Sequence, residues 1–539
     1  MLNIPYFIRL LPALLLGIFA ISAEANSFRV QCPTTTTLHP GHLTDQGAIK
    51  CQQISGGDGF ATMGDGTQTY LFGFGPLSGL TDMANGLPGT QPSSVFNVSN
   101  LDSSGVIIPS IFIGAPIDQS SQSILTGYNF NGAIGLVPDP ESAPTPNQLD
   151  GHVDPRLIMD VGVMNANMPA PLMAIDEDDE FFLTLTNVGQ IMRPDLFEQH
   201  TVHFHGYPNA SAFYDGVPDA SIAINIGGSF TYYYLAPDAG TYFWHCHISP
   251  PEHLQMGMVG QIYVRPRQNR VAGDLGVALK TANKKAAVDP VATGVGCSDI
   301  LCTGQTPLPA GANATTGATS VNGGGKYAYN DGDGSTRYDV EYPIQIHGFD
   351  PSFHFVGMTF NPESFTDMKD KYFLLNGRSY PDTISPGTMT TQSTDGTLHA
   401  SQPLPTVINI PAGGRALLRI ADLDVTEFQT LASLGIPMHV IALNARLLRD
   451  MAGNNMTYYS NSITLGGGES LDVLLDATDT YDADGTTCHT SSCKYHRGDI
   501  FYLYTPNLDH LSNDAENFGG LMTEVHICNA VDPVTKACS

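Results

Sequence analysis

The residues best suited to chemistry in this chain lie in two short clusters between positions 200 and 258. Six of the seventeen histidines fall between residues 200 and 253, and one cysteine stands among them. The donors in question are His200, His203, His205, His245, Cys246, His247, His253 and Met258. So many imidazole and sulfur ligands at short spacing indicate a metal centre rather than ordinary core histidines.

Strand geometry divides these donors between two sites. Side chains alternate along a strand, so His203 and His205 point to one side, and His245 and His247 do the same, whereas Cys246 points to the other. One thiolate with imidazoles and a thioether suits a blue copper centre, and paired imidazoles suit a second copper site. Structural zinc is the alternative metal, but zinc sites often use several cysteines, so a single thiolate among many imidazoles favours copper.

The other cysteines leave Cys246 without a partner. Eight of the nine lie in near-neighbour pairs, and an export pattern at the start of the chain makes local disulfides the expected arrangement. The expected pairs are Cys32 with Cys51, Cys297 with Cys302, Cys488 with Cys493 and Cys528 with Cys538. The remaining thiol, Cys246, is better explained as a metal ligand than as a spare cysteine.

The first residues have the pattern of an export signal. Arg9 supplies the positive end, residues 10–21 form the apolar run, and residues 23–25 are mostly small. The run is too short for a stable anchor, so we expect residues 1–25 to be a signal peptide, the mature protein to be secreted or periplasmic, and no membrane span. The formal net charge of −29 excludes nucleic acid as a partner and suits either cation attraction or simple solubility.

Two strand-rich regions are expected to position the donors. Alternating β patterns at 181–186, 201–205, 229–235, 241–244 and 259–264 surround both clusters. A connector rich in Gly, Ala, Thr and Asn separates them from a second strand-rich region. We therefore expect an all-β protein with an irregular N-terminal extension and first strands (26–156), a copper-binding domain (157–266), a linker (267–341) and a second β domain (342–539).

On these motifs the chain resembles the multicopper oxidase family. The segments 203–206, 214–218, 240–247 and 257–260 are similar to the family's first cupredoxin domain. The segments 373–378, 437–442 and 467–475 are similar to its second domain, which usually carries no copper. The resemblance covers about 157–266 and 342–530, and it implies two cupredoxin-like Greek-key β-sandwich domains with laccase-like chemistry.

The resemblance also implies roles for individual residues. His203 would bind type 2 copper, and His205, His245 and His247 would bind the type 3 pair. Asp215 matches an acid that helps to move protons during oxygen reduction, although an Asp before Gly is also an ordinary turn residue.

This chain departs from an ordinary first domain, which has a small residue in place of Cys246 and no blue copper. Here Cys246, His200, His253 and Met258 supply a type 1 set, which resembles the family's copper-bearing third domain and some two-domain oxidases. Met256 competes with Met258 as the axial ligand, and the Gly257-Met258 motif favours Met258.

The expected function is one-electron oxidation of a phenolic or metal-ion substrate, such as Mn(II), Fe(II) or Cu(I), coupled to reduction of dioxygen to water. A full trinuclear centre in this family takes eight histidines, and this chain shows four, so we expect a homo-oligomer that completes the copper cluster. A ring that joins first domains to second domains, with His439 or His510 as completing ligands, is the rival assembly.

Two other functions remain open. A copper nitrite reductase would combine type 1 and type 2 copper, but His203 stands where that enzyme needs an acid, and His247 would be superfluous. A non-enzymatic electron carrier would need only the blue site, and the size of the chain and the extra histidines argue against it.

Overall fold

The computed structural model describes ten segments of the chain. These segments are residues 29–40, 48–101, 130–142, 144–207, 211–236, 238–270, 326–354, 365–392, 398–488 and 490–539. The predicted signal peptide and the pair Cys297 and Cys302 lie outside the described residues.

The first part of the molecule is a sandwich of two sheets. One sheet has the order β2-β1-β5-β7, with β3 paired to β1, and the other has the order β4-β9-β8-β6. The strands are β1 (Ile49–Thr62), β2 (Gln68–Pro76), β3 (Gln91–Pro92), β4 (Met173–Asp176), β5 (Glu180–Gly189), β6 (His203–His205), β7 (Ser229–Leu235), β8 (Gly240–His245) and β9 (Val259–Arg265).

Apolar side chains from both sheets fill the space between them. Tyr70, Phe72 and Leu183 come from the first sheet, and Trp244 and Ile262 come from the second. The alternation of the strands sends these residues inward. Cys246 and Met258 belong to the same buried core, so the sulfur donors lie inside the sandwich.

The second part repeats this arrangement with longer sheets. Their orders are β13-β12-β17-β23-β19-β20, with β21 on β19, and β16-β25-β24-β18-β22. The strands are β12 (Val340–Phe349), β13 (Tyr372–Leu375), β16 (Ile408–Pro411), β17 (Arg415–Asp422), β18 (Gln429–Leu434), β19 (Met438–Leu443), β20 (Arg446–Leu447), β21 (Tyr458–Ser460), β22 (Ser462–Leu465), β23 (Ser470–Asp476), β24 (Ile500–Tyr504) and β25 (Met522–Cys528).

The two sandwiches share a pairing scheme. β1 runs parallel to β5, and β12 runs parallel to β17. In the facing sheets, β4 runs parallel to β9, and β16 runs parallel to β25. The two strand-rich regions therefore have matching sheet pairings.

Short elements complete the described chain. Two-stranded sheets join β10 (Lys326–Tyr327) to β11 (Arg337–Tyr338) and β14 (Met389–Gln392) to β15 (Leu398–Gln402). The helices are α2 (Leu80–Ala84), α3 (Ser93–Phe96), α5 (Pro155–Gly162) and α6 (Pro250–Met256), with 3-10 turns η2 (Ala212–Tyr214), η3 (Arg267–Arg270), η4 (Phe365–Asp367), η5 (Asp382–Ile384) and η6 (Leu508–His510).

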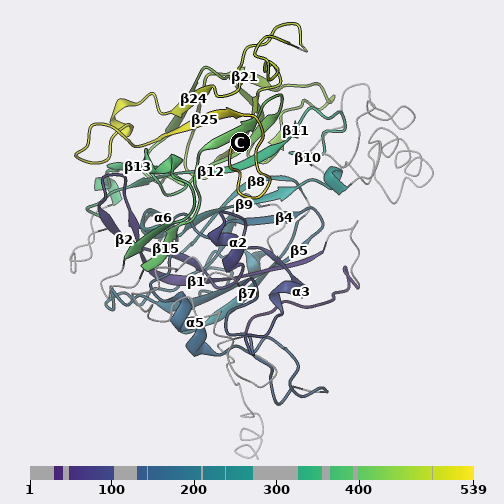
Figure 1. Ribbon diagram of the computed structural model, residues 1–539. Helices are drawn as coiled ribbons and strands as arrows, with labels where there is room; N and C mark the ends of the chain where they lie inside the picture. Colours follow the sequence, from purple (N-terminus) through teal and green to yellow (C-terminus); the bar gives the residue numbers. More distant parts are fainter. Residues whose placement is uncertain are drawn as a thin grey trace, which may run out of the picture.

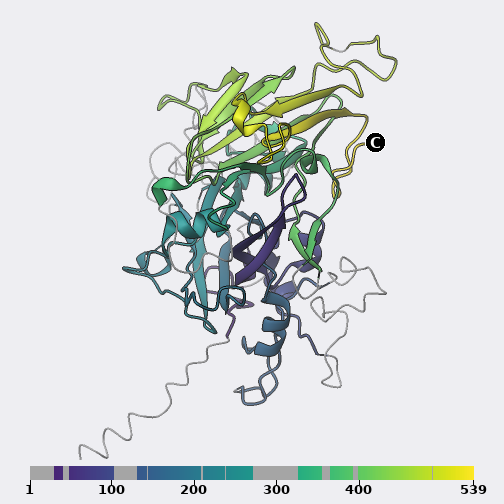
Figure 2. The same cartoon turned by 90° about the vertical axis from the view of Figure 1, so that its left-hand side faces the viewer.

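The second sandwich packs against strands β8 and β9 of the first. In Figures 1 and 2 the first sandwich is purple to teal and the second is green to yellow, and the two lie against each other as layers. At their contact Thr241 donates to Asp472 at 2.6 Å, and Gln261 donates to the backbone oxygen of Arg419 at 2.8 Å. The end of β8, where the second histidine cluster begins, therefore lies close to the second sandwich.

A buried charge group also lies at this contact. Glu341 on β12 accepts hydrogen bonds from Arg265 of β9 at 2.7 Å and from Arg419 of β17 at 3.1 Å. Burial alone would raise the pKa of Glu341, but the two guanidinium groups outweigh it and hold that pKa well below its usual range. Glu341 therefore joins a strand of each sandwich through ion pairs.

The all-β prediction is confirmed, and strands occupy the segments predicted around both clusters. Residues 49–76, which lie in the segment predicted to hold an N-terminal extension and first strands, form β1 and β2 of the first sandwich. The run from Gly56 to Gly59 consists of Gly and Asp, which are uncommon in strands, so the sequence does not indicate a strand at β1. The predicted domain boundaries stay a prediction.

The predicted disulfides Cys32–Cys51, Cys488–Cys493 and Cys528–Cys538 are confirmed. Cys246 is a free, buried cysteine. None of the helices in the described segments is both long enough and apolar enough to cross a bilayer.

Candidate metal centres

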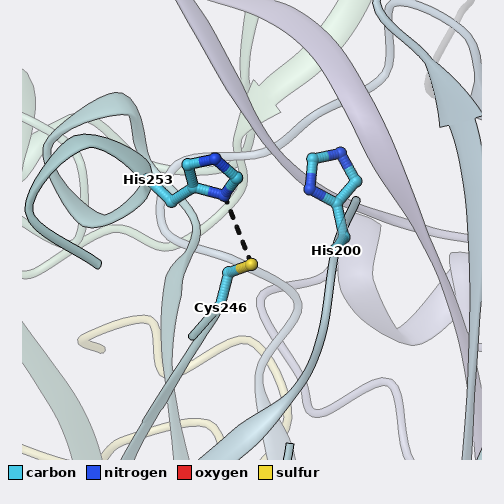
Figure 3. Close-up of side chains that lie close together, drawn as sticks. All are labelled: His200, Cys246 and His253. Carbon is cyan, nitrogen blue, oxygen red and sulfur yellow. Dashed lines mark hydrogen bonds between the residues drawn. The ribbon is translucent and has the colours of Figure 1, made fainter. Parts of the chain in front are cut away.

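The first group of donors is enclosed within the first sandwich, and we call His200, Cys246, His253 and Met258 the closed cluster. Ligand atoms of His200, Cys246 and His253 all lie within 4.8 Å of one another (Figure 3). The Nδ1 atom of His253 lies 3.3 Å from the sulfur of Cys246. All four residues are fully buried.

Different elements bring these donors together. His200 is fixed by a bridge to Ile224, with backbone hydrogen bonds of 3.1 and 2.9 Å. His253 lies on helix α6, which begins with two prolines, and Pro fits the first turn of a helix. Met258 follows that helix, and its backbone accepts from the amide of Cys246 at 3.1 Å. Helix α6, between Cys246 and Met258, thus brings Met258 back beside Cys246.

A glycine on β1 makes room for the first ligand. A β-carbon on Gly56 would stand 2.7 Å from Cδ2 of His200 and 3.5 Å from Cε of Met258. Contacts below 3.0 Å require something to shift, so a side chain here would push on the imidazole. Gly56 was not among the predicted site residues, because nothing in the local sequence shows that β1 passes over His200.

The closed cluster contains buried polar atoms with no protein partner. Within the described residues, neither ring nitrogen of His200 has a hydrogen-bond partner. Buried nitrogens without partners cost free energy, so they call for a ligand in the space they face. A thiolate, two imidazoles and a thioether are the donor set of a blue copper site, so these residues fit copper.

In the metal-free cluster the charges are those of a thiolate and an imidazolium, whose proton a bound metal ion would displace. Burial opposes ionisation of the Cys246 thiol, but His253 and His200 outweigh it and hold its pKa well below the usual range. Burial likewise favours a neutral His253, yet Cys246 and Glu198 raise its pKa to about 10. The thiolate form, which binds metal, is therefore favoured at neutral pH.

The second group of donors faces away from the core, and we call His203, His205, His245 and His247 the open cluster. Ligand atoms of His203, His205 and His245 lie within 4.8 Å of one another. The His247 ring lies 5.1 Å from the ring of His203 and 5.5 Å from that of His245. The strands place them this way because β6 pairs with β8, with His203 opposite His245.

Hydrogen bonds set the tautomers of two of these rings. Nδ1 of His203 donates to the backbone oxygen of Asp215 at 2.6 Å, and Nδ1 of His245 donates to that of Cys246 at 2.8 Å. Their Nε2 atoms are therefore left as metal-binding lone pairs. Burial lowers the pKa of His245 to about 3, which keeps this ring neutral as a ligand must be.

Asp215 lies beside the open cluster. Its carboxylate is 3.5 Å from Nδ1 of His203, in addition to the backbone contact. Asp215 thus holds a ring of the cluster, which fits the predicted position of this acid; its catalytic role stays a prediction.

The open cluster lines a cavity of about 560 Å³ between the two sandwiches. The first sandwich also contributes Phe243, Pro250, Pro251 and Leu254. The second sandwich contributes Asp424, Val425, Thr426, Glu427, Phe428, Gly466, Gly467 and Gly468. Across the cavity from the imidazoles, the described lining therefore offers carboxylates, a hydroxyl and backbone, and no further histidine.

Four histidines that follow the first sandwich in the sequence belong to neither cluster. His439 hydrogen-bonds Thr457, and His510 hydrogen-bonds Gln429, and neither lines the cavity. His347 contacts the backbone oxygen of Leu254, and His354 contacts that of Tyr70. Met256, the rival axial ligand, is buried in the same core as Met258.

Part of this chain is similar to a known protein family. Residues 151–269 match the family model described as multicopper oxidase. A laccase of Aspergillus fumigatus, Laccase abr2, is 33% identical over 109 residues, which are 20% of this chain and 17% of the laccase. A copper-containing nitrite reductase of Rhizobium meliloti is 33% identical over 114 residues, which are 20% of this chain and 27% of the reductase.

A solved structure, that of the multicopper oxidase mgLAC, aligns with 90% of this chain and 93% of its own, at 14% identity and a TM-score of 0.46. The curated relatives named above are matched over less than a third of their own length. The predicted resemblance is confirmed for the segment that contains both donor clusters.

Proposed function

Since residues 151–269 belong to the multicopper oxidase family, we propose that the whole chain is a copper-dependent oxidase. It takes single electrons from a phenolic or metal-ion substrate and reduces dioxygen to water. The observation that carries the proposal is the pair of donor clusters on opposite faces of one strand end, one enclosed and one bordering a cavity. Copper bound at these residues would supply the one-electron and oxygen chemistry.

The residues of the closed cluster suit electron entry. Glu198 approaches His253, with its Oε2 atom 3.5 Å from Nε2 of the ring. The Glu198 side chain is partly exposed, so a reductant at the surface can come within one residue of the cluster. From Cys246 the backbone leads directly to His245 and His247, which gives a short covalent path between the clusters.

The residues of the open cluster suit oxygen chemistry. Four imidazoles line the cavity, two of them with their Nδ1 atoms held by backbone oxygens. Phe243, Leu254 and two prolines form apolar walls beside them. Asp215 positions His203 and offers a carboxylate for proton movement next to it.

We also propose that the working enzyme is a homo-oligomer. The open cluster supplies four imidazoles, and the described part of the second sandwich adds none to the cavity. A second copy that presents its own histidines would complete the centre. Light scattering and copper analysis on one sample test this: a strictly monomeric protein with a fully loaded centre and full activity would exclude it.

We also propose that this oxidase is secreted. Three disulfides support it, because such bonds persist in oxidising compartments. The mature N-terminus of the natural protein, read by sequencing, would fall near residue 26 if the predicted signal is cleaved.

Dioxygen consumption measured with a panel of phenols and metal-ion reductants tests the main proposal. The copper-loaded protein should consume dioxygen, whereas protein stripped of copper should not. If the loaded protein keeps its blue colour but consumes no dioxygen with any reductant, it is not an oxidase.

A copper nitrite reductase is the second candidate, and the similarity to the Rhizobium meliloti enzyme favours it. That reaction would convert nitrite under anaerobic conditions with a reduced donor. Histidines at positions 203 and 247 argue for the oxidase, and anaerobic nitrite consumption without dioxygen consumption would reverse the choice.

A further inference from the structure

Two buried carboxyl groups of the second sandwich converge at the edge of the cavity. Asp370 precedes β13, and Asp424 follows β17, and both are largely enclosed, with exposed fractions of 7% and 2%. A β-carbon on Gly348 of β12 would stand 2.0 Å from Oδ2 of Asp370 and 2.7 Å from Oδ2 of Asp424. The two carboxyl groups therefore meet at one point, which stays open because residue 348 has no side chain.

A single hydroxyl bridges the pair. Oγ1 of Thr426 contacts Oδ2 of Asp370 at hydrogen-bond distance and Oδ1 of Asp424 at 2.9 Å. A hydroxyl has one proton to donate and otherwise accepts. Both contacts are favourable only if one of the two carboxyl groups carries a proton and donates it to Thr426.

The other contacts of the pair are with neutral donors. Gln255 donates to Asp370 at 2.9 Å, and Gln429 donates to Asp424 at 2.6 Å. Across the described segments, no lysine or arginine forms an ion pair with either carboxyl group. Two buried negative charges side by side without a cation repel each other strongly, so one proton is retained between them.

The titration of Asp370 agrees with this geometry. Burial, and then the neighbouring Asp424 carboxylate, raise the pKa of Asp370 well above its usual range.

Other titratable groups pack around the pair from each neighbouring element. They are Asp422 on β17, His347 on β12, Glu427 in the loop after β17, His510 on η6 through Gln429, and His354 through Gln255.

The pair connects two parts of the molecule that the proposed reaction uses. Asp424 and Thr426 line the same cavity as the four imidazoles of the open cluster. At its other end the pair contacts Gln255 of helix α6, the helix that carries His253. The proton held here therefore lies at the edge of the place where oxygen would be reduced.

We propose that Asp370, Asp424 and Thr426 form a proton-donating site that holds one shared proton at neutral pH and delivers it into the cavity. The proposal rests on the oxidase function given above. Reduction of one dioxygen to two waters takes up four electrons and four protons. The reducing substrate supplies the electrons through four one-electron oxidations, and each proton that leaves the carboxyl pair is replaced from solvent.

Infrared difference spectroscopy of the full-length, copper-loaded protein tests the shared proton without measuring turnover. The protonated carboxyl band, identified by its shift in D₂O, should lose the contribution of one carboxyl group in Asp370→Asn and in Asp424→Asn. Glu516→Gln removes an exposed carboxyl of the same sandwich and should leave the band unchanged. An unchanged band in both Asn variants would show that the pair holds no proton.

The bridging hydroxyl gives a second test, which stands even if an Asn variant fails to fold. Thr426→Val should shift the pH at which the band titrates, and Thr426→Ser should restore it, because serine keeps the hydroxyl. The blue colour reports whether each variant is folded. If valine and serine give the same titration, the bridge has no role and the shared proton is not held as proposed.

Delivery of the proton is tested by separating the two half-reactions. In Asp424→Asn, dioxygen consumption should fall about a hundredfold, the lower range for a positioned acid, while the blue colour bleaches at the normal rate with reductant under anaerobic conditions. Unchanged dioxygen consumption would overturn the delivery role. If the unmodified protein consumes no dioxygen, the oxidase proposal and the delivery role fail together, and the infrared result still decides whether the pair holds a proton.

Discussion

The closed and open clusters share the end of β8, where His245 belongs to the open cluster and the next residue, Cys246, belongs to the closed cluster. The two clusters differ in their surroundings. The closed cluster takes every donor from the first sandwich, and all four donors are fully buried. The open cluster has one exposed ring, two half-buried rings and one buried ring, and the second sandwich forms the far side of its cavity. The donors of the closed cluster all come from one sandwich, whereas the cavity of the open cluster is formed where the two sandwiches meet.

This difference matters for function. A buried site with few ways to move changes little when an electron arrives, which suits electron transfer. A site that borders a cavity can admit dioxygen and release water. The predictions below separate the two clusters by damaging one at a time.

Replacing the sulfur of the closed cluster should have the largest effect. Cys246→Ser removes the thiolate that gives a blue copper site its colour, so visible absorption and turnover should both be lost. Met256→Leu, in the same core but outside the proposed ligand set, is the matched control and should stay blue. A blue Cys246→Ser protein would show that the sulfur is not the ligand.

Weakening the contact between the sandwiches should damage the open cluster first. Glu341→Gln leaves Arg265 without its carboxylate and leaves Arg419 with only Asp472, at 3.9 Å. Removing one partner of a buried ion pair costs about 3 kcal/mol of unfolding free energy. Thermal unfolding and copper analysis should show lower stability and loss of copper from the open cluster, while the folded protein stays blue.

The same residue predicts a pH dependence. The pKa of Glu341 in the folded protein is below its ordinary value of 4.5, so its stabilising contribution is present above pH 4.5 and is lost as the pH falls below it. The stability difference between wild type and Glu341→Gln should therefore shrink as the pH is lowered from 6 to 3. A constant difference over that range would contradict the ion-pair explanation.

Crowding the closed cluster should have an intermediate effect. Gly56→Ala would place a methyl group 2.7 Å from the His200 ring, and overpacking of this kind costs about 1–3 kcal/mol. Copper affinity at the blue site should fall about tenfold, as for other changes next to ligands. Titration of the metal-free protein with copper, followed at the blue band, measures this; an unchanged affinity would mean that β1 does not position His200.

Changing the charge near the entry point should have the smallest effect. Glu198→Gln removes a partly exposed carboxylate beside His253, and exposed charge pairs contribute about 0.2–1 kcal/mol. KM for cationic metal-ion reductants should rise about two- to fivefold, while KM for neutral phenols stays the same. Equal changes for both substrate classes would show that Glu198 acts through structure rather than charge.

The sequence allowed the donor sets, the alternation of faces and the described disulfides to be predicted, because these depend on local spacing. It did not allow the contribution of β1 to be predicted. That strand joins β5 in parallel across about 130 residues, and its Gly-rich sequence has low strand propensity. Gly56 acquires its role only through that pairing.

The carboxyl pair was missed for a similar reason. Asp370 and Asp424 are 54 positions apart and meet only because β12, β13 and β17 are neighbours in one sheet. In the sequence each is one acid among fifty-two. Neither residue has a motif around it, so only the folded chain reveals the pair.

The register of β8 has a consequence for how the protein matures. His245 pairs with His203 on one side and with Val259 on the other. A slip by one residue would turn the sulfur toward the cavity and the imidazoles toward the core, since neighbouring side chains point to opposite faces. Such a misfolded chain would present neither donor set correctly. Only molecules with the correct β8 register would therefore bind copper tightly.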